Sequence, residues 1–231
     1  MKNTVKVSDM LPRIIIYNTI SLDGRITGFD ADLETYYQRV SFWKEDATLV
    51  SSQTILAAPD EIPPETEDDL RPKKINTADT RPLLVVVDSR GKIKTWHYLL
   101  KTPYWRSGVA LCSKSTPAEH LRYLAQRNID YIVAGNNHVD LRKALKELNS
   151  RYNVKTIRVD SGGVLNGILL RAGLIQEVSL LIHPALVGGS SHHSFFHLPH
   201  MKTSGKIINL KLTHVEQFEN GLVWMRYKVL K

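Results

Sequence analysis

The sequence T-I-R-V-D-S-G-G-V-L-N-G-I, residues Thr156 to Ile168, is the stretch around which the remainder of the chain can be arranged. Its apolar beginning, Thr156–Val159, predicts a buried strand. Gly162 and Gly163 allow the backbone to turn sharply and to approach a bulky ligand. Val164–Ala172 then predicts a helix whose first N–H groups and positive dipole end point at that turn. The pattern is typical of a phosphate-binding turn, although an ordinary strand–helix connection uses glycines in the same way.

Length and charge restrict the class of protein. At 231 residues, with 42% hydrophobic residues, the chain can form one α/β domain, residues 1–231, with an N-terminal extension (1–12) and a surface loop (59–82). Lys and Arg number 31 against 23 Asp and Glu, a net charge of +8, which suits phosphate-bearing ligands or nucleic acid. The basic residues are spread along the chain, so we favour a small phosphorylated ligand and expect no nucleic acid partner.

Cysteine content and hydropathy indicate the compartment. The single Cys112 excludes an internal disulfide and fits a reducing environment, where we expect it to be a small buried residue and not a nucleophile. The N-terminus has no apolar core like that of a signal peptide, and no apolar stretch approaches the ~20 residues of a membrane span. The sequence therefore predicts a cytoplasmic protein without a membrane partner.

Short apolar runs end in small or polar residues at four places. The runs are Arg13–Ile20, Ala47–Ser51, Leu83–Val87 and Thr156–Val159. In open α/β sheets the carboxyl ends of such strands converge on a crevice that binds ligands. Hydroxyls and an arginine at these ends can bind phosphate, but each end is also an ordinary turn or helix cap when taken alone. The candidate binding segments are Ser21–Gly24, Ser51–Thr54, Ser89–Gly91 and Ser161–Gly163.

Helix signals separate these strands. Asp32 is expected to cap a helix whose apolar and aromatic stripe is core, with members Leu33, Tyr36, Tyr37, Val40 and Trp43. Thr116–Glu119 reads as a capping box, and Asp140 is expected to cap a further helix. Two more strands, Gly108–Cys112 and Ile129–Ala134, lie between them, and the second ends at Gly135. The alternation of strands and helices predicts a mostly parallel sheet flanked by helices.

The C-terminal third contains a further strand, a histidine-rich segment and a hairpin. Val178–Ile182 predicts a strand, and five histidines follow within a short span: His183, His192, His193, His197 and His200. His192 and His193 are adjacent and would point apart, and no H-E-x-x-H motif is present, so we expect a loop and not a metal site. Asn220-Gly221 between alternating apolar residues predicts an antiparallel hairpin that closes one edge of the sheet.

Four segments in this order resemble the reductase family of riboflavin biosynthesis, whose fold is similar to dihydrofolate reductase. The segments are S-L-D-G (21–24), D-A-T-L-V-S-S-Q-T-I-L-A (46–57), V-V-V-D-S-R-G (85–91) and the long segment from V-D-S-G-G to H-P-A-L-V-G-G (159–189). The resemblance covers almost the whole chain and is most specific in the last segment. It implies an α/β, dihydrofolate reductase-like fold and a homodimer.

The resemblance also implies an activity, which is NADPH-dependent reduction of a phosphorylated ribosylaminopyrimidine to its ribityl product. Hydride would reach C1′ of an imine form of the sugar. By the same resemblance, Ser21, Asp23 and Asp160 bind substrate, with Asp23 as the catalytic candidate. The residues implied for cofactor binding are Thr54, Ser89, Arg90, Gly91, Gly135, Ser161, Gly162, Gly163, Val164 and Leu165.

The chain departs from the family pattern in three places. The usual Glu-Gly-Gly is replaced by Asp160-Ser161-Gly162-Gly163, and an acidic residue expected at Ala58 is missing. The family's Trp-Ile-Ser segment between S-L-D-G and the first helix is not recognisable. These departures bear on the substrate more than on the cofactor. One cysteine cannot build the zinc deaminase that some family members carry, so we expect a stand-alone reductase acting on the diamino pyrimidinone. A related NADPH reductase of another small substrate, or a non-catalytic nucleotide-binding protein, are the alternatives.

Overall fold

A computed structural model describes residues 10–58, 61–71, 78–189, 194–197 and 207–230. The chain divides into two compact units. Unit 1 comprises residues 1–12 and 45–157, and unit 2 comprises residues 13–44 and 158–231. The strand β6 (Thr156–Val159) contributes its first two residues to unit 1 and its last two to unit 2.

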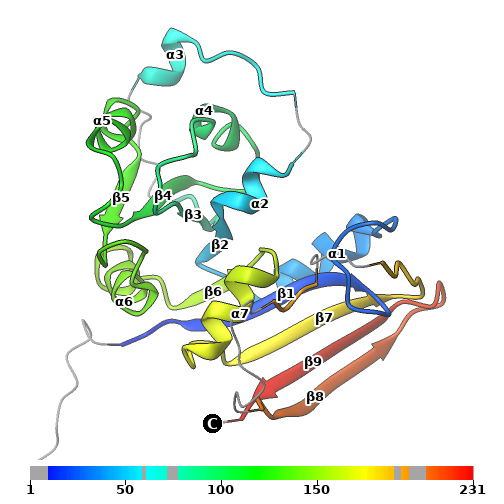
Figure 1. Ribbon diagram of the computed structural model, residues 1–231. Coiled ribbons are helices and arrows are strands. Elements are labelled where there is room, and N and C mark those ends of the chain that lie inside the picture. The colour runs from blue at the N-terminus through cyan, green and yellow to red at the C-terminus, as the bar shows by residue number, and fades with distance from the viewer. Residues whose placement is uncertain (1–9, 59–60, 72–77, 190–193, 198–206, 231) are drawn as a thin grey trace, which may run out of the picture. The chain divides into compact units, whose positions relative to one another are not determined.

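Unit 1 is built on parallel strands in the order β5-β4-β3-β2 (Figure 1). These strands are β2 (Ala47–Ser51), β3 (Leu83–Val87), β4 (Ser107–Cys112) and β5 (Asp130–Val133). Helices α5 and α6 lie on opposite sides of the sheet, as expected when helices connect parallel strands. The helices of the unit are α2 (Ser52–Leu56), α3 (Glu67–Leu70), α4 (Trp96–Leu99), α5 (Ala118–Gln126) and α6 (Leu141–Tyr152).

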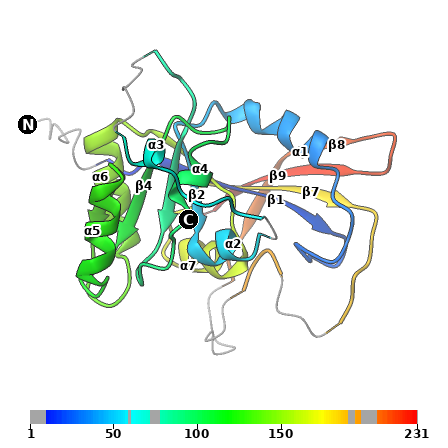
Figure 2. The same cartoon turned by 90° about the horizontal axis from the view of Figure 1, so that it is seen from above.

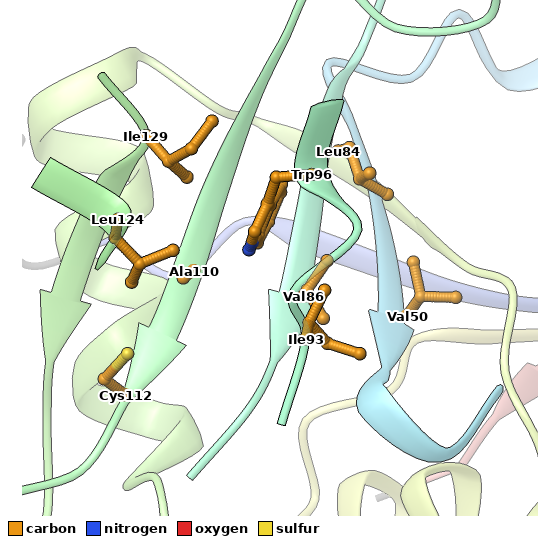
Figure 3. Close-up of a cluster of buried hydrophobic side chains, with 9 residues drawn as sticks. All are labelled: Val50, Leu84, Val86, Ile93, Trp96, Ala110, Cys112, Leu124 and Ile129. Atoms are coloured by element: carbon orange, nitrogen blue, oxygen red, sulfur yellow. The ribbon is translucent and has the colours of Figure 1, made fainter. Parts of the chain in front are cut away.

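The core on one face of this sheet is a cluster of fully or almost fully buried side chains around Trp96 (Figure 3). The strands contribute Val50, Leu84, Val86, Ala110 and Cys112, and Leu124 of α5 and Ile129 pack against them. Cys112 belongs to this cluster, and burial raises the pKa of its thiol to about 12. The prediction that Cys112 is a small core residue is therefore confirmed, because a neutral buried thiol is a poor nucleophile.

Unit 2 is built on strands in the order β1-β7-β9-β8, of which β1 and β7 are parallel and the others antiparallel. Its helices α1 and α7 lie on opposite faces of these strands (Figure 2). Alternation along β1 explains this arrangement, since Tyr17 stacks on Tyr36 of α1 and Asn18 bonds to Asn166 of α7. The elements are β1 (Arg13–Ser21), α1 (Leu33–Val40), the 3₁₀ helix η2 (Ser41–Trp43), α7 (Gly163–Arg171), β7 (Glu177–His183), β8 (Leu210–Gln217) and β9 (Val223–Val229).

The predicted fold class is confirmed. Each predicted strand is present within two residues of its expected limits, the sheet is mostly parallel, and β8 and β9 form the antiparallel C-terminal hairpin. Gly221 in the hairpin turn has φ of 83°, a conformation that glycine adopts without strain. Asp32 and Asp140 cap α1 and α6 as predicted, because each carboxylate accepts a hydrogen bond from the backbone N–H three residues later.

Three local predictions need correction. The stripe on α1 is core only in part, because Tyr36 and Trp43 are buried whereas Leu33 and Tyr37 are about half exposed. Thr116 does not cap α5. Its hydroxyl instead accepts from Ser113 N (3.0 Å) and donates to Ser89 O (2.8 Å), so a tertiary contact replaces the local one. The described part of the 59–82 loop contains the helix α3.

Among the described helices, none combines the length and apolarity that a membrane span requires. Of the histidine-rich segment, His192, His193 and His200 lie outside the described residues.

Candidate functional site

The residues predicted to bind ligands fall into two sets, one in each unit. Unit 1 holds Thr54, Ser89, Arg90, Gly91 and Gly135. Unit 2 holds Ser21, Asp23, Asp160 and the segment 161–165. Each set lies at or just beyond the carboxyl ends of strands, as the sequence predicted.

The turn after β3 is shaped by a buried carboxylate. Asp88 accepts hydrogen bonds from the backbone N–H groups of Lys92 and Ile93, both at 2.9 Å, and its own carbonyl accepts from Gly91 N. These bonds close a tight loop that carries Ser89 and Arg90 at its tip. The role of Asp88 was not predicted from the sequence. The signal for it is an acidic residue directly after the apolar run Leu83–Val87, because an acid that is buried there needs hydrogen-bond donors.

Ser89 and Arg90 differ in how the protein uses them. The Ser89 hydroxyl accepts from Val139 N at 3.1 Å, which leaves its hydrogen available for a ligand. The Arg90 side chain is exposed and makes no hydrogen bond or ion pair with the described residues. A fixed hydroxyl beside an unpaired guanidinium is a donor pair that matches a phosphate monoester.

Gly91 and Gly135 are required by the fold itself. Both have positive φ, 64° and 84°. A Cβ on Gly91 would lie 2.5 Å from Cγ of the buried His120, and one on Gly135 would overlap the His138 carbonyl. These two glycines are therefore explained without a ligand.

Thr54 belongs to the short helix α2. Its backbone N–H donates to the Ser51 hydroxyl (3.2 Å), and the two hydroxyls lie 3.0 Å apart. The first interaction is the N-cap that the sequence allowed as the alternative to phosphate binding. Thr54 thus has a local structural role, and its contact with a cofactor stays a prediction.

The glycines at the start of α7 have different surroundings. A Cβ on Gly163 would overlap the Ser194 carbonyl oxygen and lie 2.9 Å from His197 N, which also donates to Gly163 O. A Cβ on Gly162 would have Ile26 Cδ1, 3.6 Å away, as its nearest neighbour. The backbone of segment 194–197 therefore explains Gly163, whereas no described neighbour requires a glycine at 162.

A buried amide network supports this turn from below. Asn18 Nδ2 donates to the Ser161 carbonyl (3.0 Å), and Asn166 Nδ2 donates to Asn18 Oδ1 (2.9 Å) and to the Phe195 carbonyl (2.7 Å). Asn18, Ser161 and Asn166 are buried, and their hydrogen bonds fix the D-S-G-G turn against β1. Sequence reasoning missed the network. The signal in the sequence was an asparagine inside each of two apolar elements, Asn18 in β1 and Asn166 in α7.

Ser21 and Asp23 form a second fixed group at the end of β1. The Ser21 hydroxyl donates to Asp23 Oδ1 at 2.6 Å, and Asp23 also accepts from Val187 N (3.1 Å) and Gly188 N (2.8 Å). These hydrogen bonds, that of Ser21 foremost, hold the pKa of Asp23 well below its usual range. Asp23 is therefore an ionised carboxylate at neutral pH, suited to accept hydrogen bonds and not to donate a proton.

Asp160 lies at the end of β6 with its side chain about one-third exposed. Its Oδ2 accepts from Nη1 of the buried Arg158 at 2.9 Å. The partly exposed Asp160 carboxylate is accessible to a ligand, whereas the buried Arg158 side chain is not. Among the described residues, no group of three or more His, Cys, Asp or Glu side chains is arranged to hold a metal ion.

A family model described as the RibD C-terminal domain matches residues 12–224 of the chain. The 2,5-diamino-6-ribosylamino-4(3H)-pyrimidinone 5′-phosphate reductase of Methanothermobacter thermautotrophicus is 29% identical over 78% of this chain and 81% of its own length. The reductase of the same name from Archaeoglobus fulgidus is 27% identical over 78% and 84%.

Solved structures agree on the fold. A pyrimidine reductase-like protein from Corynebacterium diphtheriae superposes with a TM-score of 0.70 at 16% identity, covering 100% of this chain and 97% of that one. RibD from Acinetobacter baumannii superposes with a TM-score of 0.69 at 20% identity, covering 95% of this chain but only 58% of the longer RibD chain. The family match spans more than nine-tenths of the sequence, and the chain therefore belongs to the RibD C-terminal domain family, the riboflavin-pathway reductases.

Proposed function

We propose that the protein reduces the ribosyl group of 2,5-diamino-6-ribosylamino-4(3H)-pyrimidinone 5′-phosphate to a ribityl group, with NADPH as the reductant. The observation that carries the proposal is that four curated relatives, each matched over about three-quarters or more of both chains, share the name of this reductase. NADPH would supply hydride to C1′ of the ring-opened sugar, and a proton from solvent or from a group on the protein would complete the reduction.

The two sets of residues suit different parts of these reactants. Ser89 and Arg90 offer a neutral and a charged donor to the 2′-phosphate of the cofactor. Among the described residues only Ile26 Cδ1 lies within 4 Å of a Cβ built at Gly162, and this position at the N-terminus of α7 suits a pyrophosphate, which a side chain would keep away. Asp23 and Asp160 are acceptors for sugar hydroxyls, and the fixed charge of Asp23 excludes it as the proton donor.

NADPH should bind at least tenfold more tightly than NADH, because a charge-assisted hydrogen bond to phosphate contributes roughly 1.5 to 3 kcal/mol. Arg90→Ala should remove most of this preference and leave NADH binding unchanged. Fluorescence titration of both cofactors measures the effect. The neighbouring Lys92→Ala removes the same charge from the same loop and serves as the control. Equal dissociation constants for the two cofactors in the unmutated protein would contradict the assignment.

The homodimer implied by the family resemblance is also part of the proposal. Leu210, Leu212 and Val215 of the edge strand β8 are exposed, and they pair with residues of β9 on one face of the hairpin. An edge strand with an apolar face is suited to packing against a second copy.

We place this reductase in the cytoplasm, which fits its single buried thiol.

Val215→Asp should convert the dimer to a monomer at micromolar concentration without loss of folding, since Val215 is 57% exposed in the single chain. Light scattering coupled to size-exclusion chromatography measures the mass. Lys211→Asp places a carboxylate on the same strand but on the opposite face, and it should stay dimeric. A monomeric unmutated protein, or a dimeric Val215→Asp, would show that this face is not the interface.

A further inference from the structure

Arg158 is a buried charge that the proposed reaction does not explain. Its side chain is 5% exposed in β6, where the preceding and following residues, Ile157 and Val159, belong to the apolar core. Its Nη1 donates both to Asp160 Oδ2 (2.9 Å) and to the Tyr36 hydroxyl (3.1 Å). A buried guanidinium is unfavourable unless its partners are held in place, so the fold must fix these partners.

Tyr36 is held firmly. Its ring stacks on Tyr17 with centroids 4.5 Å apart and planes at 4°, and the Tyr17 hydroxyl donates to the Tyr36 carbonyl at 3.2 Å. The Tyr36 hydroxyl donates to the Tyr17 carbonyl at 3.4 Å and accepts from Arg158 Nη1. Burial raises the pKa of Tyr36 well above its ordinary value, so the phenol keeps its proton. Arg158, which is buried on the inner side of Asp160, therefore links the fixed Tyr36 hydroxyl to this carboxylate.

The outer side of Asp160 is different. The carboxylate is 36% exposed, and Arg158 contacts its Oδ2. Rotation of the carboxylate would break the bond from Arg158, so the orientation of Oδ1 is set from inside the protein. A carboxylate oxygen held in this way is preorganised to accept hydrogen bonds from a ligand hydroxyl or amino group.

We propose that Arg158 and Tyr36 are positioning residues that hold Asp160 for hydroxyl groups of the sugar of the substrate. The inference rests on the proposed function and extends it, because it names the residues through which Asp160 acts. It assigns neither residue a direct contact with substrate or cofactor. If Arg158 and Tyr36 served stability alone, their replacement would lower the melting temperature without an effect that depends on Asp160.

The test is a double-mutant cycle of Tyr36→Phe and Asp160→Asn, read as kcat and KM for the pyrimidine phosphate at saturating NADPH. Tyr36→Phe keeps the stacked ring and removes one hydroxyl. It should raise KM and lower kcat/KM by about fivefold in the unmutated background, and change kcat/KM by less than about twofold when Asp160 is already Asn. NADPH affinity should stay the same throughout. Arg158→Lys, which keeps the charge but loses the planar fork, should lower kcat/KM at least as much as Tyr36→Phe.

Tyr17→Phe is the matched control. It removes a hydroxyl from the same stacked pair, but that hydroxyl bonds to the backbone of α1 and not to Asp160. It should lower the melting temperature and leave KM unchanged. Equal, additive losses from Tyr36→Phe in both backgrounds, or no loss at all, would overturn the positioning role while the reductase activity stands. No turnover by the unmutated protein would contradict the proposed function itself, and the inference with it.

Discussion

Gly162→Val should abolish NADPH binding in a protein that remains folded. Among the described residues, a Cβ at residue 162 meets only Ile26 Cδ1, at the ordinary contact distance of 3.6 Å, and the φ of −74° is available to any residue. The fold therefore tolerates a side chain here, whereas a pyrophosphate at the start of α7 would not. We expect at least a tenfold loss of affinity, or roughly 1.4 kcal/mol, by fluorescence titration. The unfolding free energy, from denaturant melts, should change by less than about 1 kcal/mol.

The neighbouring Gly163→Val is the contrasting variant. A Cβ there overlaps the backbone oxygen of Ser194, which cannot move without displacing segment 194–197. We expect a loss of about 1 to 3 kcal/mol of stability, which outweighs the helix propensity gained over glycine. The sequence pattern alone does not distinguish the two glycines, because the difference lies in the contact of residue 163 with segment 194–197. Normal NADPH binding by Gly162→Val would show that the turn has a structural role only.

Asp23→Asn should lower kcat/KM for the pyrimidine phosphate by at least tenfold, or about 1.4 kcal/mol, because the fixed carboxylate orients the hydroxyls of the reacting sugar. The carboxylate accepts from Ser21, Val187 and Gly188, and an asparagine NH2 cannot accept from an N–H donor. The variant would thus lose the charge and at least one of these three hydrogen bonds, since asparagine keeps only one acceptor oxygen. NADPH affinity should stay within about threefold, roughly 0.65 kcal/mol.

The pH dependence of Asp23 follows from the same hydrogen bonds. Its pKa is lowered in the folded protein, so its contribution to stability is present above the unfolded pKa and is lost only as the pH falls into the acid range. Titration of Asp23 should therefore produce no change in activity near neutral pH. Asp30→Asn, an exposed aspartate of the same segment, is the control and should behave like the unmutated enzyme. Unchanged turnover in Asp23→Asn would leave that residue as a turn-stabilising aspartate.

The sequence predicted the fold well where local patterns decide the structure. Continuous apolar runs mark strands that are buried on both faces, as Ile14, Ile15 and Ile16 of β1 show. The capping residues Asp32 and Asp140 each accept a hydrogen bond from the backbone N–H three residues later. This separation is short enough to be recognised in the sequence. Asn220-Gly221 likewise forms its turn from two adjacent residues.

The rest depends on contacts between residues far apart in the chain. Thr116 has the spacing of a capping box, but its hydroxyl is used by Ser89, 27 residues away. Arg158 and Tyr36 are separated by 122 residues, so nothing in the local pattern of either indicates that they meet at one hydroxyl. Gly163 is explained by Ser194 for the same reason. Sequence spacing predicts which residues share an element, while tertiary packing determines how their polar atoms are used.

The most direct test of the proposed function is NADPH consumption by the purified protein with 2,5-diamino-6-ribosylamino-4(3H)-pyrimidinone 5′-phosphate, followed by absorbance and by mass analysis of the product. We predict one NADPH consumed per ribityl product formed. Turnover should be far slower with the same compound lacking its 5′-phosphate, and undetectable with Gly162→Val. Failure of the unmutated protein to oxidise NADPH with this substrate, under conditions where it binds the cofactor, would contradict the assignment.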